Sequence, residues 1–414
     1  MDETRLRDLY DDVLDWRFKG MPPTHPSLQG PASRGPTVAE WLATGPLAAE
    51  LETPVVLLSA QALDHNLEAM AAWCAARGLA LAPHGKATMA PQLWQRQLGA
   101  GAVGITVANP FQAGVAHHFG VPRILIANQV ADPAAVARCS LWAREGTRIG
   151  LFSDSTQSTD LLSRAATAPI DVLVELGTPG GRAGARTRAA ALEVAAAIEA
   201  APNLRLAGVA GYEGAVTAGT DAAALAAVDD YLGELAALFG ALDFATDRPV
   251  VTAGGSAYFD RVAAVLGPLA DRAEVVLRSG SYLVHDHGCY ARWTPAARGG
   301  DGPELRPALQ ARSRVLSRPE PGLAILDAGR RDLPFDQDLP IPLGLEGDPG
   351  AEPAHCPQIS DQHLFLKGAP GHLAVGDTVA LGLSHPCTSF DKWRLIPVVD
   401  EETGRVVDAI RTFF

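Results

Sequence analysis

No stretch of the 414-residue sequence reaches the roughly 18 uninterrupted apolar residues that a membrane-spanning helix needs. The opening residues, MDETRLRDLYDDVLDW, also lack an apolar core of signal-peptide length. Positive charge is scarce, because 34 Lys and Arg stand against 47 Asp and Glu, for a formal net charge of −13. Such a chain would repel a nucleic-acid backbone. We therefore expect a cytoplasmic protein that binds neither nucleic acid nor a membrane.

Cysteine is rare as well. The five cysteines are scattered and odd in number, without a CxxC pair, which argues against a disulfide framework and favours free thiols or a metal ligand. Apolar residues make up 47% and charged residues 20%, which is ordinary for a globular protein. The length suits one large catalytic domain and a smaller one.

Short β-prone runs alternate with Ala- and Leu-rich helical stretches between residues 79 and 280. The eight runs are LALAP (79–83), AVGITV (102–107), RILIA (123–127), RIGLFS (148–153), DVLVEL (171–176), LAGVAGY (206–212), PVVTAG (249–254) and EVVLRSG (274–280). An open doubly wound sheet shows the same alternation, but the count of eight favours a closed α/β barrel of the (β/α)8 type.

After residue 300 the pattern changes to β-prone runs between Pro, Gly and Asp turns, which predicts a mainly β C-terminal domain. We place the barrel at residues 53–300, including the preceding run TPVVLLS, and the β domain at residues 301–414. The first 52 residues are expected to pack with the β domain.

Active sites of such barrels lie where the strands end, so Lys86, which follows LALAPHG, is the first candidate. A desolvated amine there has a lowered pKa and can form a Schiff base. An exposed loop lysine is the simpler interpretation of this residue taken alone.

Two glycine-containing turns also follow predicted strands. TAGGS contains Gly254, Gly255 and Ser256, and RSGSY contains Gly280 and Ser281. Small residues let backbone N–H groups approach and hold a phosphate, and the last strands of a barrel are its usual phosphate site. Ordinary strand-to-helix turns are the alternative for either loop alone.

Two further side chains stand at strand ends. Arg182, in GTPGGRAG, could bind a cofactor oxygen, and Tyr212, in GYEG, either faces the barrel mouth or lies in the core.

His385 and Cys387 alternate with Pro386 in LSHPCTSF, so an extended segment would point both side chains to one face. Imidazole plus thiolate favours zinc, and a pair without further protein ligands suits an open catalytic site better than a structural one. Manganese and magnesium are the alternatives. A buried thiol beside an ordinary histidine is the competing interpretation. His363 and Asp327 are weaker candidates, expected to be structural turn residues.

Taken in order, PHGKAT, ELGTPGGRAG, GYEG, TAGGS, SGSY, LDAG, SDQH and SHPC resemble the motif series of the D-serine dehydratase and D-threonine aldolase family, within the alanine-racemase fold type of pyridoxal-phosphate enzymes. The resemblance runs from about residue 53 to 400. It implies a barrel joined to a β domain, usually as a homodimer, that acts on a small D-amino acid.

The resemblance also implies residue roles. Lys86 would carry pyridoxal 5′-phosphate, Arg182 would lie near its ring, and His385 and Cys387 would bind the metal. The residues around the ring and phosphate would be Tyr212, Gly254, Gly255, Ser256, Gly280, Ser281 and Tyr282. Cys387, where aldolases tend to have Asp, favours elimination of water from a β-hydroxy D-amino acid, giving a 2-oxo acid and ammonia.

The resemblance has departures, and other functions stay open. Thr88 and Met89 stand where family members commonly carry His and Lys. The same residues could cleave the Cα–Cβ bond to glycine and an aldehyde, as an aldolase does. A racemase, a non-catalytic pyridoxal-phosphate carrier and a cofactor-free metal hydrolase are the remaining alternatives.

Overall fold

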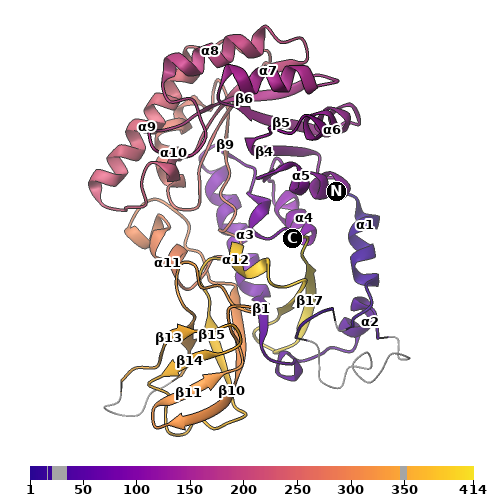
Figure 1. Ribbon diagram of the computed structural model, residues 1–414, viewed down its shortest axis with the longest axis vertical. Helices are drawn as coiled ribbons and strands as arrows, with labels where there is room; N and C mark the ends of the chain where they lie inside the picture. Colours follow the sequence, from indigo (N-terminus) through magenta and orange to yellow (C-terminus); the bar gives the residue numbers. More distant parts are fainter. Residues whose placement is uncertain (16, 21–34, 346–351) are drawn as a thin grey trace.

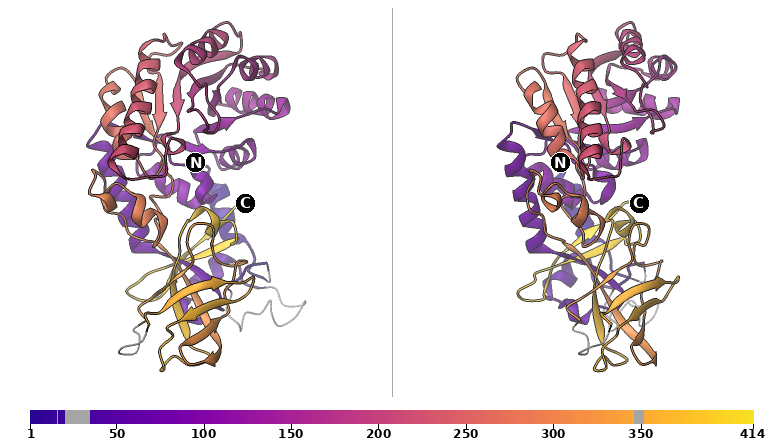
Figure 2. Two further views of the ribbon diagram at one scale, coloured as in Figure 1. Left: turned by 60° about the vertical axis from the view of Figure 1, so that its left-hand side comes forward. Right: turned by 90° about the vertical axis from the view of Figure 1, so that its left-hand side faces the viewer.

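The computed structural model describes residues 1–15, 17–20, 35–345 and 352–414. Figures 1 and 2 show two lobes, a barrel above and a β-rich lobe below, with α3 running beside both. No helix among the described residues is long and apolar enough to cross a membrane. All five cysteines are free, as expected.

The upper lobe is built on an eight-stranded parallel sheet in the order β2-β9-β8-β7-β6-β5-β4-β3. The edge strands meet through hydrogen bonds from Val103 N to Leu81 O (2.8 Å) and from Thr106 N to Pro83 O (2.9 Å). The predicted barrel is thereby confirmed. Its strands are β2 (Ala80–Leu81), β3 (Ile105–Val107), β4 (Arg123–Gln129), β5 (Arg148–Ser153), β6 (Ile170–Leu176), β7 (Leu204–Gly211), β8 (Val250–Ala253) and β9 (Glu274–Leu277).

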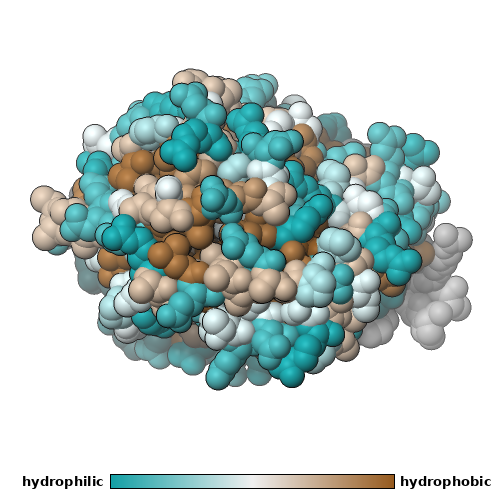
Figure 3. All heavy atoms as spheres, turned by 90° about the horizontal axis from the view of Figure 1, so that it is seen from above, coloured by the Kyte–Doolittle hydropathy of each residue, from teal (hydrophilic) through white to brown (hydrophobic). Residues whose placement is uncertain are grey.

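Helices cover the outside of the barrel, and most begin at a side chain that accepts a hydrogen bond from the first turn, among them Ser59, Asn109, Ser155 and Thr187. The helices are α3 (Ala60–Ala75), α4 (Pro91–Gly99), α5 (Pro110–His118), α6 (Pro133–Arg144), α7 (Thr156–Ala165), α8 (Arg188–Glu199), α9 (Ala222–Gly240) and α10 (Phe259–Leu266). Seen from above, hydrophobic residues show near the centre of this end of the molecule and hydrophilic ones around it (Figure 3).

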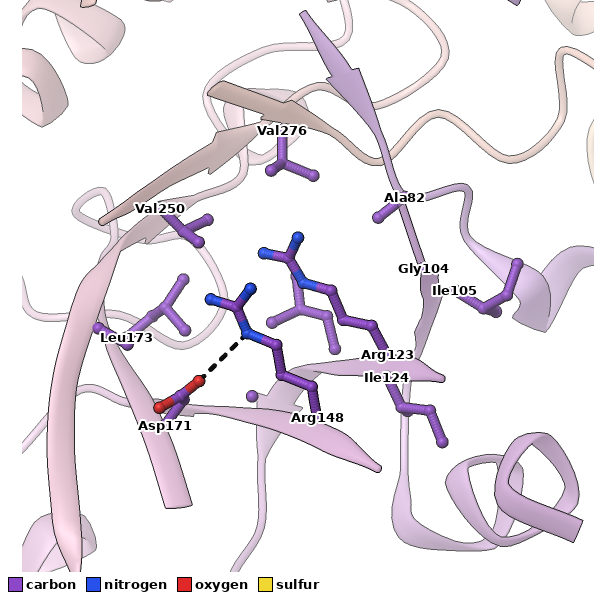
Figure 4. A pocket seen from close by; sticks show the side chains of 13 residues that line it. Ala82, Gly104, Ile105, Arg123, Ile124, Arg148, Asp171, Leu173, Val250 and Val276 are labelled. Carbon is purple, nitrogen blue, oxygen red and sulfur yellow. Dashed lines mark hydrogen bonds and ion pairs between the residues drawn. The ribbon is translucent and has the colours of Figure 1, made fainter. Parts of the chain in front are cut away.

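Charged residues close the end of the barrel where the strands begin. Arg148 Nε lies 3.4 Å from Asp171 Oδ2, and Arg123 pairs with Glu274 at 2.6 Å. Both guanidinium groups point into the space bordered by Leu173, Val250 and Val276 (Figure 4). That space measures about 20 Å³, which is room for about one water molecule. A ligand must therefore enter the barrel from the opposite end.

The lower lobe is a second, mainly antiparallel sheet in the order β13-β14-β11-β10-β1-β16-β17, with β15 paired to β10 and β12. Its strands are β1 (Val55–Ser59), β10 (Leu309–Glu320), β11 (Leu323–Leu326), β12 (Ile341–Leu343), β13 (His355–Ile359), β14 (Leu364–Lys367), β15 (Thr378–Gly382), β16 (Leu395–Val399) and β17 (Val406–Arg411). Short helices α1 (Glu3–Asp8), α2 (Val38–Ala43), α11 (Cys289–Trp293) and α12 (Cys387–Phe390) complete the chain, with 3₁₀ turns at Leu9–Asp11, Ala48–Glu50, Gly85–Ala87, Glu213–Ala215, Gly267–Leu269 and Ala296–Arg298.

The run TPVVLLS does not join the barrel, although the sequence assigned it to that segment. As β1 it lies inside the second sheet, antiparallel to β10 and parallel to β16. All five of its residues are buried, because the strand is covered on both faces. The β lobe is therefore built from both ends of the chain.

The described part of the N-terminal segment contacts both lobes. Tyr10 donates a hydrogen bond to Asp408 Oδ1 (2.7 Å) and Arg411 pairs with Asp12 (2.6 Å), which joins this segment to β17. Asp2 N donates to Phe119 O of the barrel (2.9 Å).

Asn66, fully buried on α3, joins the lobes. Its amide nitrogen donates to the carbonyls of Leu283 (3.0 Å) and Arg306 (2.7 Å), and its oxygen accepts from Arg306 N (2.7 Å). These contacts fix the chain that leaves the barrel mouth toward β10.

Replacing Asn66 with Ala should leave these backbone groups without partners and lower the free energy of unfolding by about 3 kcal/mol. Urea denaturation measures the change, with Gln95→Ala on the exposed face of α4 as the control. A loss below about 1 kcal/mol for Asn66→Ala would contradict this role.

Candidate active site

A cavity of about 370 Å³ opens at the ends of the barrel strands, next to α12 of the β lobe. It brings together nearly all the residues that the sequence singled out, from six separate segments. Those that line it are Lys86, Arg182, Tyr212, Gly254, Gly255, Ser256, Gly280, Ser281, His385 and Cys387. Tyr282 is the exception: it points into the core, where its hydroxyl accepts a hydrogen bond from Gln97 (3.1 Å).

Lys86 lies on the 3₁₀ turn that directly follows β2, so its amine stands at the barrel mouth. Burial lowers its pKa below the ordinary lysine value. Cys387 opposes this shift, and the positive charges of Arg182 and Arg278 lower the pKa of Lys86 further. A larger fraction of this amine is therefore uncharged and nucleophilic near neutral pH than for an exposed lysine.

Two arginines border the cavity, and they differ in their contacts. Arg278, directly after β9, is buried and held by hydrogen bonds to Thr252 Oγ1 (2.7 Å) and Gly211 O (2.6 Å). Arg182 lies over the ring of Tyr212, 4.3 Å from its centroid. The sequence analysis did not single out Arg278. It directly follows a barrel strand, however, as the other candidates do, and could have been found for that reason.

The two glycines of the TAGGS turn face a carboxylate. Glu213 is fully buried, and its two oxygens accept hydrogen bonds from the amides of Gly254 (2.9 Å) and Gly255 (2.6 Å). We expected these two amides to be open to a phosphate. They are instead occupied, so an anion at this turn must use neighbouring donors.

Such donors exist in the same two turns. In the described part of the chain, the amides of Ser256, Gly280 and Ser281 have no hydrogen-bonded acceptor. Gly280 is also required sterically, because a Cβ there would lie 2.4 Å from His84 O. The α10 helix begins at Phe259, just after Ser256, and its N-terminus favours a negative charge. The two turns therefore offer unpaired N–H donors that could hold an anion.

His385 and Cys387 are adjacent, but not by the strand alternation that the sequence suggested. His385 has a left-handed backbone (φ 61°), and α12 begins at Cys387, so a tight turn brings the two side chains together. The hydrogen bond with Cys387 is the main cause that raises the pKa of His385, to about 9, and Asp336 raises it further. Imidazole and thiolate at this spacing can share a metal ion.

The turn that carries His385 is held by Asp286, a fully buried carboxylate from the end of the barrel. Asp286 accepts hydrogen bonds from the amides of His385 (2.9 Å), Gly288 (3.0 Å) and Tyr290 (3.0 Å). One side chain thus fixes both the candidate metal loop and the α11 helix, whose Tyr290 also lines the cavity.

The other candidate residues lie outside the cavity. Asp327 accepts hydrogen bonds from Thr53 (2.6 Å) and Ser313 (2.7 Å), away from the cavity, and His363 is exposed on a turn. Thr88 and Met89, where the sequence departs from the family pattern, are both buried.

Several residues to which the sequence analysis gave no role also line the cavity, namely His84, Asn128, Glu175 and Tyr290. Glu175 is the penultimate residue of β6 and could have been found by inspecting the strand ends. His84 is half-buried beside Lys86, and its buried Nδ1 has no hydrogen-bond partner among the described residues. Tyr290 carries no sequence signal, because it lies on a helix beyond the barrel.

The cavity fits an anionic aldehyde cofactor and a metal. A lysine of lowered pKa, two arginines, unpaired amides at two turns and the orphaned His84 Nδ1 are donors and acceptors suited to pyridoxal phosphate. At the same cavity, the nitrogen and sulfur of His385 and Cys387 could supply two ligands of a tetrahedral zinc site, which would leave two positions for water or substrate.

Comparison with known proteins agrees with this geometry. Residues 58–273 match the model of the alanine racemase N-terminal domain, and residues 308–399 match the putative serine dehydratase domain. The chain is 31% identical over 358 residues to a D-threonine aldolase of an Arthrobacter species and 28% identical over 356 residues to the 3-hydroxy-D-aspartate aldolase of Paracoccus denitrificans. In each case the match covers 83% of this chain and 88% of the relative.

The crystal structure of D-threonine aldolase from Filomicrobium marinum superposes with a TM-score of 0.78 at 28% identity, covering 89% of this chain and 97% of that one.

Replacing Asp286 with Asn should destabilise the fold, because one carboxylate oxygen becomes an NH2 group that faces N–H donors. We expect the free energy of unfolding to fall by about 3 kcal/mol. Urea denaturation tests this, with the exposed Asp243→Asn as the control. Equal stability of the two variants would show that Asp286 does not hold the loop.

Proposed function

This chain belongs to the family of alanine-racemase-fold lyases that carry a serine dehydratase domain, and we propose that it cleaves a β-hydroxy D-amino acid with pyridoxal 5′-phosphate and a divalent metal. One observation carries the proposal: the amine of Lys86 and the His385–Cys387 pair line the same cavity. An amine that can bind an aldehyde cofactor thus faces the same substrate as two residues that can hold a metal ion, and that ion can bind a hydroxyl group.

The cofactor roles follow from the contacts. Lys86 Nζ would hold the cofactor, and the amides of Ser256, Gly280 and Ser281 would hold its phosphate, while Glu213 fixes Gly254 and Gly255. Arg278, Arg182 and Tyr212 border the space left for the ring. When bound, the cofactor withdraws electrons from the substrate Cα. Tyr282, buried against Gln97, is not part of this set.

His385 and Cys387 would hold the metal, with zinc preferred because of the sulfur ligand. When bound, the metal supplies a Lewis acid for the β-hydroxyl group. Lys86 Nζ would move a proton in either reaction: it would accept the Cα proton in elimination, and in aldol cleavage it would accept the β-hydroxyl proton and return it to Cα. Burial lowers the pKa of Lys86 and so increases the fraction of uncharged amine that can accept a proton.

We favour aldol cleavage to glycine and an aldehyde, since both curated relatives described above are aldolases. Elimination of water to a 2-oxo acid and ammonia is the second candidate, because Cys387 supports it and residues 308–399 match a serine dehydratase domain. The homodimer and the cytoplasmic location expected from the sequence are part of this proposal, and the five free thiols are consistent with a reducing compartment.

Purified protein supplied with pyridoxal phosphate and Zn²⁺, Mn²⁺ or Mg²⁺ should release glycine and an aldehyde from D-threonine or D-threo-3-hydroxyaspartate. Lys86→Ala should lower this rate by about 10³-fold or more and abolish the borohydride-stable adduct, since it removes the nucleophile. Lys367→Ala, on an exposed strand position, is the control. Ammonia and oxo acid as products would instead indicate elimination, and an unaffected Lys86→Ala variant would refute the assignment.

Removing the metal with a chelator should lower turnover by about 10²-fold while leaving the cofactor spectrum in place, because the two groups have separate protein ligands. Adding the metal back should restore the rate. Full activity after chelation, verified by metal analysis, would contradict a catalytic metal.

A further inference from the structure

Asp336 reaches the candidate metal pair from a distant part of the chain. It lies in the segment between β11 and β12, 49 residues before His385, yet its Oδ2 lies 2.5 Å from His385 Nδ1. No sequence pattern links the two residues.

The second oxygen of Asp336 is also engaged. Thr388, the residue after Cys387, donates a hydrogen bond from Oγ1 to Asp336 Oδ1 (2.6 Å). The carboxylate is therefore held at both oxygens by the turn that carries His385 and Cys387. Both oxygens of Asp336 are directed at His385 and Thr388. The carboxylate is therefore oriented to hold His385 in place rather than to act as a third metal ligand beside His385 and Cys387.

This contact decides which nitrogen of the ring can bind a metal. Because Nδ1 faces the carboxylate, it keeps a proton, and Nε2 is the nitrogen that would give up its proton to bind a metal shared with Cys387. A carboxylate on the far nitrogen makes the metal-binding nitrogen more basic and stops the ring from rotating. The backbone of the same residue is fixed independently, by the hydrogen bond from His385 N to Asp286 Oδ2 (2.9 Å).

We propose that Asp336 is a positioning residue for the metal, which holds the His385 ring in the tautomer and orientation that binding requires. The inference rests on the proposed function, because it assumes that His385 is a metal ligand. It adds a residue from outside the motif series and assigns the β11–β12 segment a part in the active site.

The test measures the dissociation constant of Zn²⁺ from the cofactor-loaded protein, by competition with a chromophoric chelator. Asp336→Asn keeps the size of the side chain but removes its charge, and we expect it to bind Zn²⁺ about 10–100-fold more weakly. Thr388→Val, which removes one of the two anchors of the carboxylate, should give a smaller loss of about 3–10-fold. Asp361→Asn, an exposed carboxylate of the same lobe, is the matched control and should stay within about twofold of the unaltered protein.

Two further measurements separate the possible outcomes. The thermal midpoint of each metal-free variant shows whether it is folded, and a purely structural role would lower that midpoint without weakening Zn²⁺ binding by the folded protein. If Asp336→Asn does not fold, the Thr388→Val result decides. His385→Ala tests the premise and should lose Zn²⁺ binding by about 10²-fold or more.

Loss of affinity in His385→Ala but not in Asp336→Asn or Thr388→Val would overturn the role of Asp336 and leave the metal site standing. Unchanged affinity in His385→Ala would overturn the metal site itself, and the inference with it.

Discussion

The candidate site depends on the burial of one charge. A carboxylate without exposure to water is tolerated only when hydrogen bonds replace its hydration, and Asp286 obtains them from the amides of its own loop and of His385. These donors come from segments 99 residues apart. The hydrogen bonds to this carboxylate therefore hold the end of the barrel and the turn that carries His385 and Cys387 in one fixed arrangement.

The same principle explains the charges inside the cavity. Arg278 is buried, and Glu213 and Glu175 supply the opposing charges nearby. Lys86 and Arg182 lie at the same cavity without an ion pair among the described residues. The cavity therefore contains two guanidinium groups in a protein whose net charge is −13. Guanidinium groups within an acidic molecule favour small anionic ligands, such as a phosphate or an amino-acid carboxylate, over large acidic partners.

Aldol cleavage and elimination need nearly the same protein groups. Both use a lysine that moves a proton at Cα and a metal that binds the β-hydroxyl, so the residues of this cavity are compatible with either. The difference lies in which bond to the β-carbon breaks. Tyr290, Asn128 and the β lobe contribute walls of the cavity in which that choice would be made.

The sequence by itself determined the barrel, the free thiols and most of the cavity, because strand ends in a parallel barrel all point to one mouth and local residue patterns mark them. It misassigned β1, since a buried strand has the same pattern in either sheet, and it placed Tyr282 at the site although that ring turns into the core. Only the tertiary structure decided that Glu213 occupies the glycine amides and that Asp336 and Asp286 hold His385. These are hydrogen bonds between distant or non-periodic positions, and no local pattern of residues encodes which buried donor will meet which acceptor.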